Sequence, residues 1–214
     1  MNQWLYGIDK GITDAIHFGL QNKIFDTMMP FITRLGDAGF IWIAISIILI
    51  CTKKYRKVGI TSLLAISIGT ILTEGVIKHL VERVRPIIAY PIDNPLIKLP
   101  ISFSFPSGHT ASSIAVAYVL STYIKRYKFY FISLAILIGF SRIYLYVHYF
   151  SDVLGGAVVG LVSGILAVYI MGKINKRKEK NGILAYKITK GMSQNKLNFI
   201  KVQAQYLVRF SELF

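Results

Sequence analysis

Apolar residues fill most of this chain in stretches long enough to cross a lipid bilayer. Five such stretches are clear, at about 38–52, 58–80, 110–125, 128–147 and 152–172. Each reaches or approaches the roughly 20 residues that a membrane helix needs. Backbone inside hydrocarbon must satisfy its own hydrogen bonds, which a helix does. The pattern therefore predicts an all-α fold, a polytopic membrane helical bundle.

The first 35 residues are less hydrophobic than the rest. Between Trp4 and Leu20, apolar residues recur at helical spacing but are interrupted by charged ones, which predicts an amphipathic helix lying in the membrane interface. The apolar piece that follows, up to Leu35, contains Pro30 and is too short to cross a bilayer unaided. The alternative is that this segment contains a further membrane crossing, so we expect five to six transmembrane helices.

The composition changes again after the last apolar stretch. We divide the chain into an interfacial N-terminal segment (1–35), a transmembrane domain (36–172) and a basic cytoplasmic tail (173–214). The tail contains one amphipathic stretch at 199–210, which can lie on anionic lipid of the inner leaflet. The alternative is a loosely ordered cytoplasmic end.

Charge adds the orientation in the membrane. The chain has 25 Lys and Arg against 10 Asp and Glu, a formal net charge of +15. The basic residues gather where apolar stretches end, in the segments 53–57, 125–128 and 173–180, which is the pattern of membrane orientation rather than of nucleic-acid binding. With these clusters in the cytoplasm, the loop 81–109 and the turn 148–151 face the extracytoplasmic side. We expect a multi-pass plasma-membrane protein without a nucleic-acid partner.

The stretch SRIYLYVHYFSD lies at the outer mouth of one predicted span and contains Arg142, His148 and Asp152. On a helix, His148 and Asp152 would share one face, one turn apart. A carboxylate in that position can keep one imidazole nitrogen protonated and leave the other free as a nucleophile. The arginine offers a planar fork suited to phosphate oxygens. The alternative is an interfacial histidine beside an ordinary helix cap.

Two further motifs face the same side of the membrane. KHLVERVRP contains Lys78 and Arg85, either of which alone could be a basic residue snorkelling to the interface. In PSGH, Ser107 is a preferred N-cap residue, Gly108 allows close approach of a ligand, and His109 follows in the first helical turn. Free N–H groups at such a helix start form an anion site. Because these groups face the same side of the membrane as SRIYLYVHYFSD, we interpret all three motifs as parts of one anion-binding catalytic site.

Together, KHLVERVRP, PSGH and SRIYLYVHYFSD resemble the three-part signature of the type 2 phosphatidic acid phosphatase superfamily. This superfamily includes lipid phosphate phosphatases, bacterial phosphatidylglycerophosphate and undecaprenyl diphosphate phosphatases, glucose-6-phosphatase and vanadium haloperoxidases. The resemblance covers about 35–172, with all three motifs complete and in order. It implies a membrane hydrolase without metal or other cofactor, whose partners are a lipid phosphate substrate and membrane lipids. It implies nothing about oligomeric state.

Carried over residue by residue, the resemblance implies a two-step phosphoryl transfer. His148 attacks phosphorus and forms a phosphohistidine, Asp152 orients His148, and His109 protonates the leaving oxygen. Glu74, four residues before Lys78, is expected to form a helical ion pair with it rather than to contact substrate. The residues expected to hold the phosphate oxygens are Lys78, Arg85, Ser107, Gly108 and Arg142.

The expected site lies at headgroup depth, where a lipid phosphate can enter while its tails stay in the bilayer. The outward orientation favours undecaprenyl diphosphate and a role in cell-wall biogenesis, with phosphatidylglycerol phosphate or phosphatidic acid as alternatives. Two more distant alternatives are chemistry like that of vanadium haloperoxidases and a non-catalytic lipid-binding or transport protein.

Overall fold

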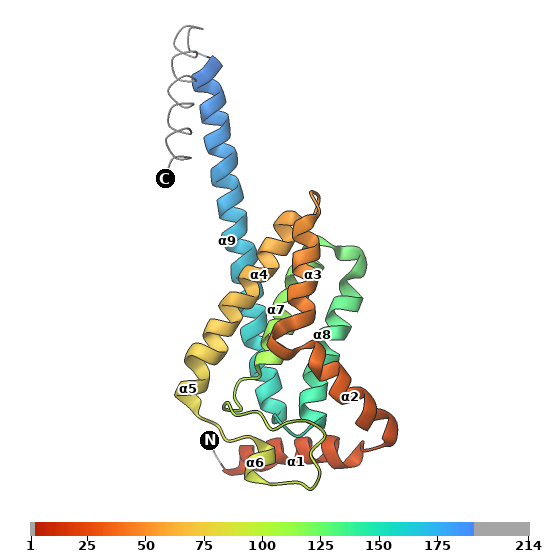
Figure 1. Cartoon of the computed structure of the whole chain (residues 1–214). Helices are drawn as coiled ribbons and strands as arrows, with labels where there is room; N and C mark the ends of the chain where they lie inside the picture. Colours follow the sequence, from red (N-terminus) through yellow and green to blue (C-terminus); the bar gives the residue numbers. More distant parts are fainter. Residues whose placement is uncertain (1–2, 191–214) are drawn as a thin grey trace, which may run out of the picture. The chain divides into compact units, whose positions relative to one another are not determined.

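All regular structure in the described part of the chain is helical, which confirms the predicted all-α class (Figure 1). The computed structural model describes residues 3–190, so the predicted amphipathic stretch at 199–210 lies outside the described residues. In chain order the helical segments are α1 (Gln3–Gly19), α2 (Lys23–Leu35), η1 (Asp37–Gly39), α3 (Phe40–Cys51), α4 (Arg56–Thr70), η2 (Ile71–Ile77), α5 (Lys78–Val81), α6 (Pro86–Ala89), α7 (Gly108–Tyr123), η3 (Lys125–Tyr127), α8 (Lys128–Tyr144) and α9 (Phe150–Lys190).

The chain divides into two units, Met1–Tyr169 and Ile170–Phe214. The first unit holds α1 to α8 and the first part of α9, and it contains every residue of the predicted site. In the second unit, α9 continues as far as Lys190. The described beginning of the predicted tail, up to Lys190, is therefore helical.

Helices α2 and α3 form the two arms of one bent segment. With 12 residues, α3 alone covers about 18 Å, which is well short of a hydrocarbon core of about 30 Å. The two arms together have the length and composition of a membrane span, with a bend of 48° at η1. Ala38 and Gly39 adopt positive φ angles at this break. The piece that is too short to cross by itself thus completes a candidate span.

Within residues 3–190, two other helical runs are long and apolar enough to cross a membrane, Arg56–Ala89 and Phe150–Asn181. Helices α7 and α8 have 16 and 17 residues, somewhat fewer than the roughly 20 of an average membrane helix. The first run contains η2, a seven-residue π-helical segment, and such segments occur often at functional sites. The count of five to six crossings stays a prediction.

The first part of α9 packs directly on α7 through a row of glycines. A Cβ atom would lie 2.5 Å from the Ser107 carbonyl oxygen if placed on Gly156, and 2.4 Å from the Ala111 carbonyl oxygen if placed on Gly160. Small residues spaced four apart let membrane helices approach until their backbones touch. This packing sets the start of α9 against the start of α7, where two of the predicted motifs lie.

Helix α1 lies across the end of the bundle at which α9 begins (Figure 1). Its polar residues Asp9, Thr13 and His17 are buried against the protein, whereas Trp4 and Ile8 are exposed. This is the reverse of an amphipathic helix on a soluble protein, and an apolar outer face is what a helix lying on lipid requires. The predicted amphipathic helix is therefore present, and its interfacial position stays a prediction.

Candidate active site

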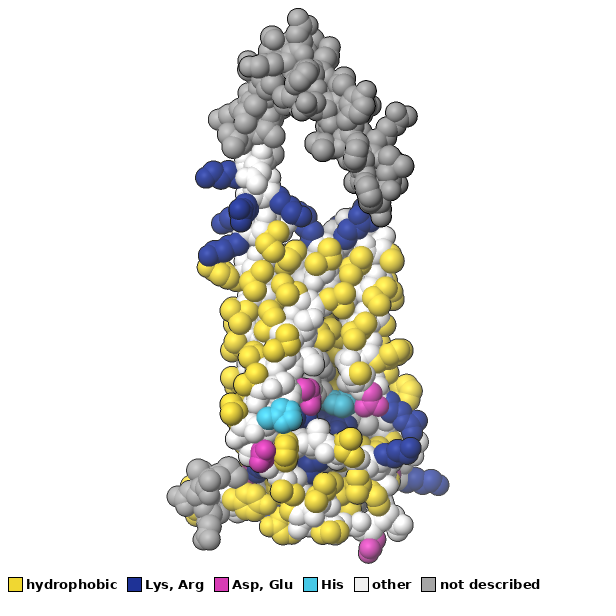
Figure 2. Space-filling view, turned by 60° about the vertical axis from the view of Figure 1, so that its left-hand side comes forward, with side chains coloured by type: hydrophobic (Ala, Val, Ile, Leu, Met, Phe, Trp, Pro, Cys, Tyr) yellow, Lys and Arg dark blue, Asp and Glu magenta, His cyan; other side chains and the backbone are white. Residues whose placement is uncertain are grey.

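The predicted site residues meet where α7 begins, α8 ends and α9 begins. Figure 2 shows hydrophobic side chains over much of one face of the molecule and, beneath them, a band in which histidine and acidic side chains surround a few Lys and Arg. Arg85, Arg142, Lys78 and His109 all lie close enough to His148 to influence its charge. One cluster therefore unites residues from all three sequence motifs.

His148 lies in the loop between α8 and α9 and not on a helix, in contrast to the expectation from its spacing. The backbone N–H of His148 donates to the Arg142 carbonyl at 3.2 Å. Two residues earlier, Tyr146 turns the chain with a φ of 59°. Asp152, in the first turn of α9, reaches back so that its Oδ2 accepts the Tyr149 N–H at 2.8 Å, as in a capping box. This backward reach brings Asp152 Oδ2 to 3.5 Å from His148 Nδ1.

Arg85 covers the opposite nitrogen of the imidazole. Its Nη1 lies 3.0 Å from His148 Nε2 and donates to the Val147 carbonyl at 2.7 Å. A guanidinium has only donors, so Nε2 must be the accepting, unprotonated nitrogen and Nδ1 must carry the proton on the Asp152 side. Burial, followed by the charges of Arg85 and Arg142, holds the pKa of His148 well below its ordinary value. The imidazole is therefore neutral at physiological pH, with its free electron pair facing the cations.

Lys78 and Arg85 share Ser102. Lys78 Nζ and Arg85 Nη2 each lie 3.1 Å from the Ser102 Oγ. The expected ion pair of Lys78 with Glu74 is present, at 2.7 Å between Nζ and Oε1. Glu74 Oε1 also lies against the start of α7, since a Cβ on Gly108 would come within 2.5 Å of it. The glycine in PSGH thus leaves space for a negatively charged group at this helix start.

Ser107 joins the start of α7 to the start of α9. Its Oγ caps α7 by accepting the Thr110 N–H, as predicted, and its own N–H donates to the Asp152 carbonyl at 3.0 Å. The two helix starts that supply His109 and Asp152 are therefore held together through their backbones.

The break between α2 and α3 supplies partners for two predicted site residues. His109 Nε2 lies 2.9 Å from Asp37 Oδ1, and a Cβ on Gly36 would meet the His109 ring at 2.8 Å. Arg142 Nη1 donates to the Thr33 Oγ1 at 2.5 Å, whereas the buried Arg142 Nε has no hydrogen-bond partner. That leaves the Nε donor of Arg142 available for another acceptor.

Several residues of the cluster were not predicted from the sequence. Ser104 Oγ donates to Asp152 Oδ2 at 2.5 Å, and Arg83 Nη1 donates to Asp152 Oδ1 at 2.7 Å. Arg83 stands inside the motif KHLVERVRP, which could have drawn attention to it. Ser102, Ser104 and Asp37 had no such signal, because only the folded chain brings them to the site.

The positive charge of the cluster comes from side chains. Across residues 3–190, no group of three His, Cys, Asp or Glu side chains is placed to hold a metal ion. Lys78, Arg85 and Arg142 all lie close enough to His148 to influence its charge. Fixed cations and a helix start of this kind can stabilise the charge of a transferring phosphoryl group.

Comparison with known proteins supports the same family. Residues 59–176 match the PAP2 superfamily. The chain is 35% identical to phosphatidylglycerophosphatase B of Bacillus subtilis, over 72% of this chain and 78% of the relative. It is 32% identical to an undecaprenyl-diphosphatase of Sulfolobus acidocaldarius, over 67% of this chain and 69% of the relative.

A solved structure supports the same family. The crystal structure of a transmembrane PAP2-type phosphatidylglycerolphosphate phosphatase from Bacillus subtilis superposes with a TM-score of 0.66 and 30% sequence identity, covering 81% of this chain and 89% of that one. The family inferred from the three motifs is thus confirmed. The chain belongs to the PAP2 superfamily and is a membrane phosphatase.

Proposed function

We propose that this protein is a metal-independent lipid phosphatase that removes the terminal phosphate of undecaprenyl diphosphate through a phosphohistidine on His148. The observation that carries the proposal is the setting of the His148 ring. Nδ1 faces the Asp152 carboxylate and Nε2 faces Arg85, so that the free electron pair points into the space where the phosphorus of a bound phosphate would lie.

In the first step, His148 Nε2 forms a bond to the terminal phosphorus while the bond from phosphorus to the bridging oxygen breaks. His109 donates a proton to that oxygen, and undecaprenyl phosphate leaves. In the second step, water attacks the phosphohistidine and gives a proton to His109 while the bond from phosphorus to His148 Nε2 breaks, so that inorganic phosphate is released and both histidines are restored. Arg85 Nη1, now 3.0 Å from Nε2, turns to a phosphate oxygen when substrate binds.

The phosphate oxygens are held by the five residues named from the motifs. Lys78, Arg85 and Arg142 supply charge, Ser107 and the Gly108 backbone supply the helix start, and the unpaired Arg142 Nε supplies a donor. Phosphoryl transfer depends mainly on positioning and on charge around the equatorial oxygens. This is why three fixed cations can carry out the task that a metal ion has in other enzymes.

The site faces the extracytoplasmic side in this proposal. The basic segments 53–57 and 125–128 lie at the turns between α3 and α4 and between α7 and α8, at the ends of these helices remote from His148 (Figure 1). Positive loops stay in the cytoplasm, so a site at the other end acts on a phosphate of the outer leaflet. Undecaprenyl diphosphate released there during cell-wall synthesis is the favoured substrate.

Phosphatidylglycerol phosphate is the second candidate substrate. It is favoured by the 35% identity to phosphatidylglycerophosphatase B, whereas the relative named undecaprenyl-diphosphatase is 32% identical. Turnover of the two lipids by one preparation of the purified protein, in the same detergent, decides between them. A higher kcat/KM for phosphatidylglycerol phosphate would replace the first substrate by the second.

The chemistry is tested by phosphate release in the presence of a chelator. We expect full activity of the parent protein, loss of activity in His148→Ala, and parent-like activity in His79→Ala, whose histidine is exposed. An acid-labile phosphoenzyme should form in the parent and be absent in His148→Ala. Activity that is lost on chelation, or kept in His148→Ala, contradicts the proposed mechanism.

A further inference from the structure

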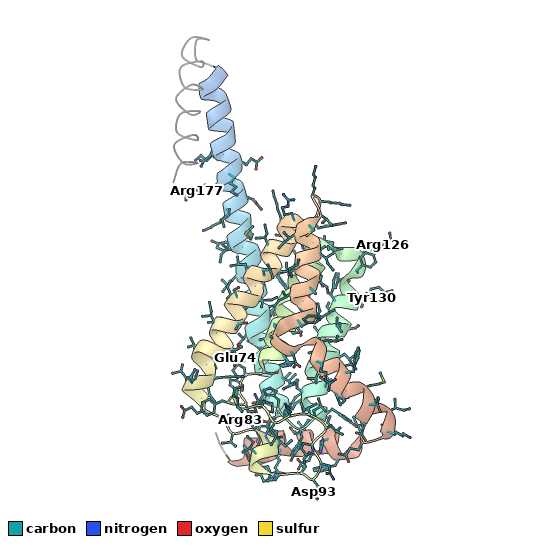
Figure 3. All side chains as sticks on the ribbon, in the orientation of Figure 1. Glu74, Arg83, Asp93, Arg126, Tyr130 and Arg177 are labelled. Atoms are coloured by element: carbon teal, nitrogen blue, oxygen red, sulfur yellow. The ribbon has the colours of Figure 1, made fainter. Side chains whose placement is uncertain are left out.

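Arg83 links the predicted orienting carboxylate to α1 at the end of the bundle. Its guanidinium lies between two carboxylates, with Nη1 2.7 Å from Asp152 Oδ1 and Nη2 2.6 Å from Asp9 Oδ2. Figure 3 labels Arg83 in the loop between α5 and α6, near the end of the bundle that α1 crosses. Three segments far apart in the chain therefore meet at this one side chain.

The three charged groups are withdrawn from solvent. Their side chains are 11% exposed for Arg83, 7% for Asp9 and 0% for Asp152. The guanidinium also lies over the Tyr149 ring, 3.9 Å from its centroid. Burying a carboxylate without a partner costs free energy. Removal of Arg83 would therefore leave Asp9 and Asp152 unpaired, and their side chains would have to move.

Asp9 also fixes the chain immediately before Asp152. Its Oδ1 accepts the Ser151 N–H at 2.8 Å, and its Oδ2 lies 2.5 Å from the Ser151 Oγ. The Ser151 Oγ in turn accepts a hydrogen bond from Arg83 Nη1 at 2.7 Å. The first turn of α9 is thus held from α1 through both its backbone and its side chains.

Each oxygen of Asp152 has its own set of partners. Oδ1 accepts from Arg83, while Oδ2 accepts from Ser104 and from the Tyr149 N–H and faces His148 Nδ1. Arg83 therefore acts on the side of the carboxylate that is turned away from the imidazole. Because Arg83 is shared with Asp9, the trio keeps one negative charge, and Asp152 can still polarise His148.

We propose that Arg83, held from its other side by Asp9 of α1, is a positioning residue that fixes Asp152 and through it the His148 imidazole. This inference rests on the proposed function, in which His148 is the nucleophile. The ion pairs of Arg83 are to two carboxylates, and its guanidinium lies over two tyrosine rings. Its buried Nε has no hydrogen-bond partner among the described residues, but both of its Nη atoms are already engaged by carboxylates and a hydroxyl. We therefore assign Arg83 a role in turnover and not in phosphate binding.

The test compares Arg83→Gln, Arg83→Lys and Asp9→Asn with Lys10→Gln as the matched control. Lys10 is the next residue on α1, and its ion pair with Asp14 is outside the Asp9 cluster. We expect kcat to fall about 10- to 100-fold in Arg83→Gln, the range found when a group that orients a metal-ligating histidine is removed. The Ki of inorganic phosphate as a competitive inhibitor should stay within about twofold of the parent value, because the residues that bind phosphate are unchanged.

Partial recovery of kcat in a lysine variant distinguishes a positioning role of Arg83 from one that depends only on the size of its side chain. Lysine keeps the charge but cannot join two carboxylates with a planar fork, so Arg83→Lys should retain a kcat between those of the parent and Arg83→Gln. Asp9→Asn should also lower kcat while leaving the phosphate Ki unchanged. Lys10→Gln should have the kcat and the phosphate Ki of the parent. A parent-like kcat in Arg83→Gln, or a phosphate Ki that rises as much as kcat falls, overturns the proposal.

A second measurement does not depend on turnover. The Tyr149 N–H donates to Asp152, so its amide hydrogen exchange, followed by NMR in detergent, reports how firmly the carboxylate is held. We expect faster exchange in Arg83→Gln and parent-like exchange in Lys10→Gln; equal exchange in both overturns the proposal. If the parent itself releases no phosphate, the proposed function fails, and the exchange comparison still decides the role of Arg83.

Discussion

Replacement of Gly156 by alanine tests how closely the two helix starts must approach. A Cβ at this position would lie 2.5 Å from the Ser107 carbonyl oxygen and 3.0 Å from Thr110 Cβ. Ordinary contact begins near 3.4 Å, so the starts of α7 and α9 must separate by about 0.9 Å unless other atoms move. The Ser107 carbonyl oxygen belongs to the backbone of α7's N-cap, so it cannot move aside as the end of a flexible side chain can.

The separation would act directly on the site. Ser107 and Asp152 are joined across this contact by a backbone hydrogen bond of 3.0 Å, and their helices supply the proposed acid and the orienting carboxylate. A misplacement of about 1 Å in a catalytic arrangement can cost about 100-fold in rate. Overpacking of this kind also destabilises by about 1–3 kcal/mol.

The assay measures kcat for phosphate release and the thermal midpoint of Gly156→Ala beside those of Gly172→Ala. Gly172 is also on α9, and a Cβ there would meet nothing within 4 Å. Alanine favours a helix over glycine by about 1 kcal/mol, so the control should be fully active and at least as stable as the parent. Equal kcat and equal thermal midpoints in the two variants would refute the reasoning.

Two further predictions concern charge. Glu74→Gln should lower the Ki of inorganic phosphate by about 3- to 10-fold, because Lys78 loses a carboxylate that competes with phosphate; inhibition kinetics measure this, and an unchanged or raised Ki contradicts it. Because the pKa of His148 is lowered in the folded protein, the unfolded chain binds the extra proton first as pH falls. The free energy of unfolding should therefore be fully maintained above about pH 6.5 and decline below it. Denaturation between pH 5 and 8 should show a shallower decline in His148→Asn, and equal slopes would contradict the assignment.

The helical class and the chemistry of the cluster could be predicted because both are local properties of the sequence. Apolar stretches indicate helices, and the spacing within the three motifs identifies the family. The geometry around His148 was less predictable. Its spacing from Asp152 indicated a shared helix, whereas the two residues meet because Asp152 reaches back from the first turn of α9.

The bent segment of α2 and α3 shows a second limit. Its two halves are 13 and 12 residues long, and each is short of a crossing when judged alone. Whether they act together depends on the backbone at η1 and on what packs there. Thr33 and Asp37, on either side of the break, contact Arg142 and His109, and hydrophobic periodicity carries no information about such contacts.

The sequence by itself determined that the chain is a helical membrane protein of the PAP2 superfamily and which charged side chains are candidates for its site. Short-range spacing and the cost of charge in hydrocarbon suffice for that. Only the tertiary structure decided which neighbours hold those side chains. Arg83 meets Asp9 across 74 residues and Asp152 across 69, and such pairings arise from helix packing, which no local pattern specifies.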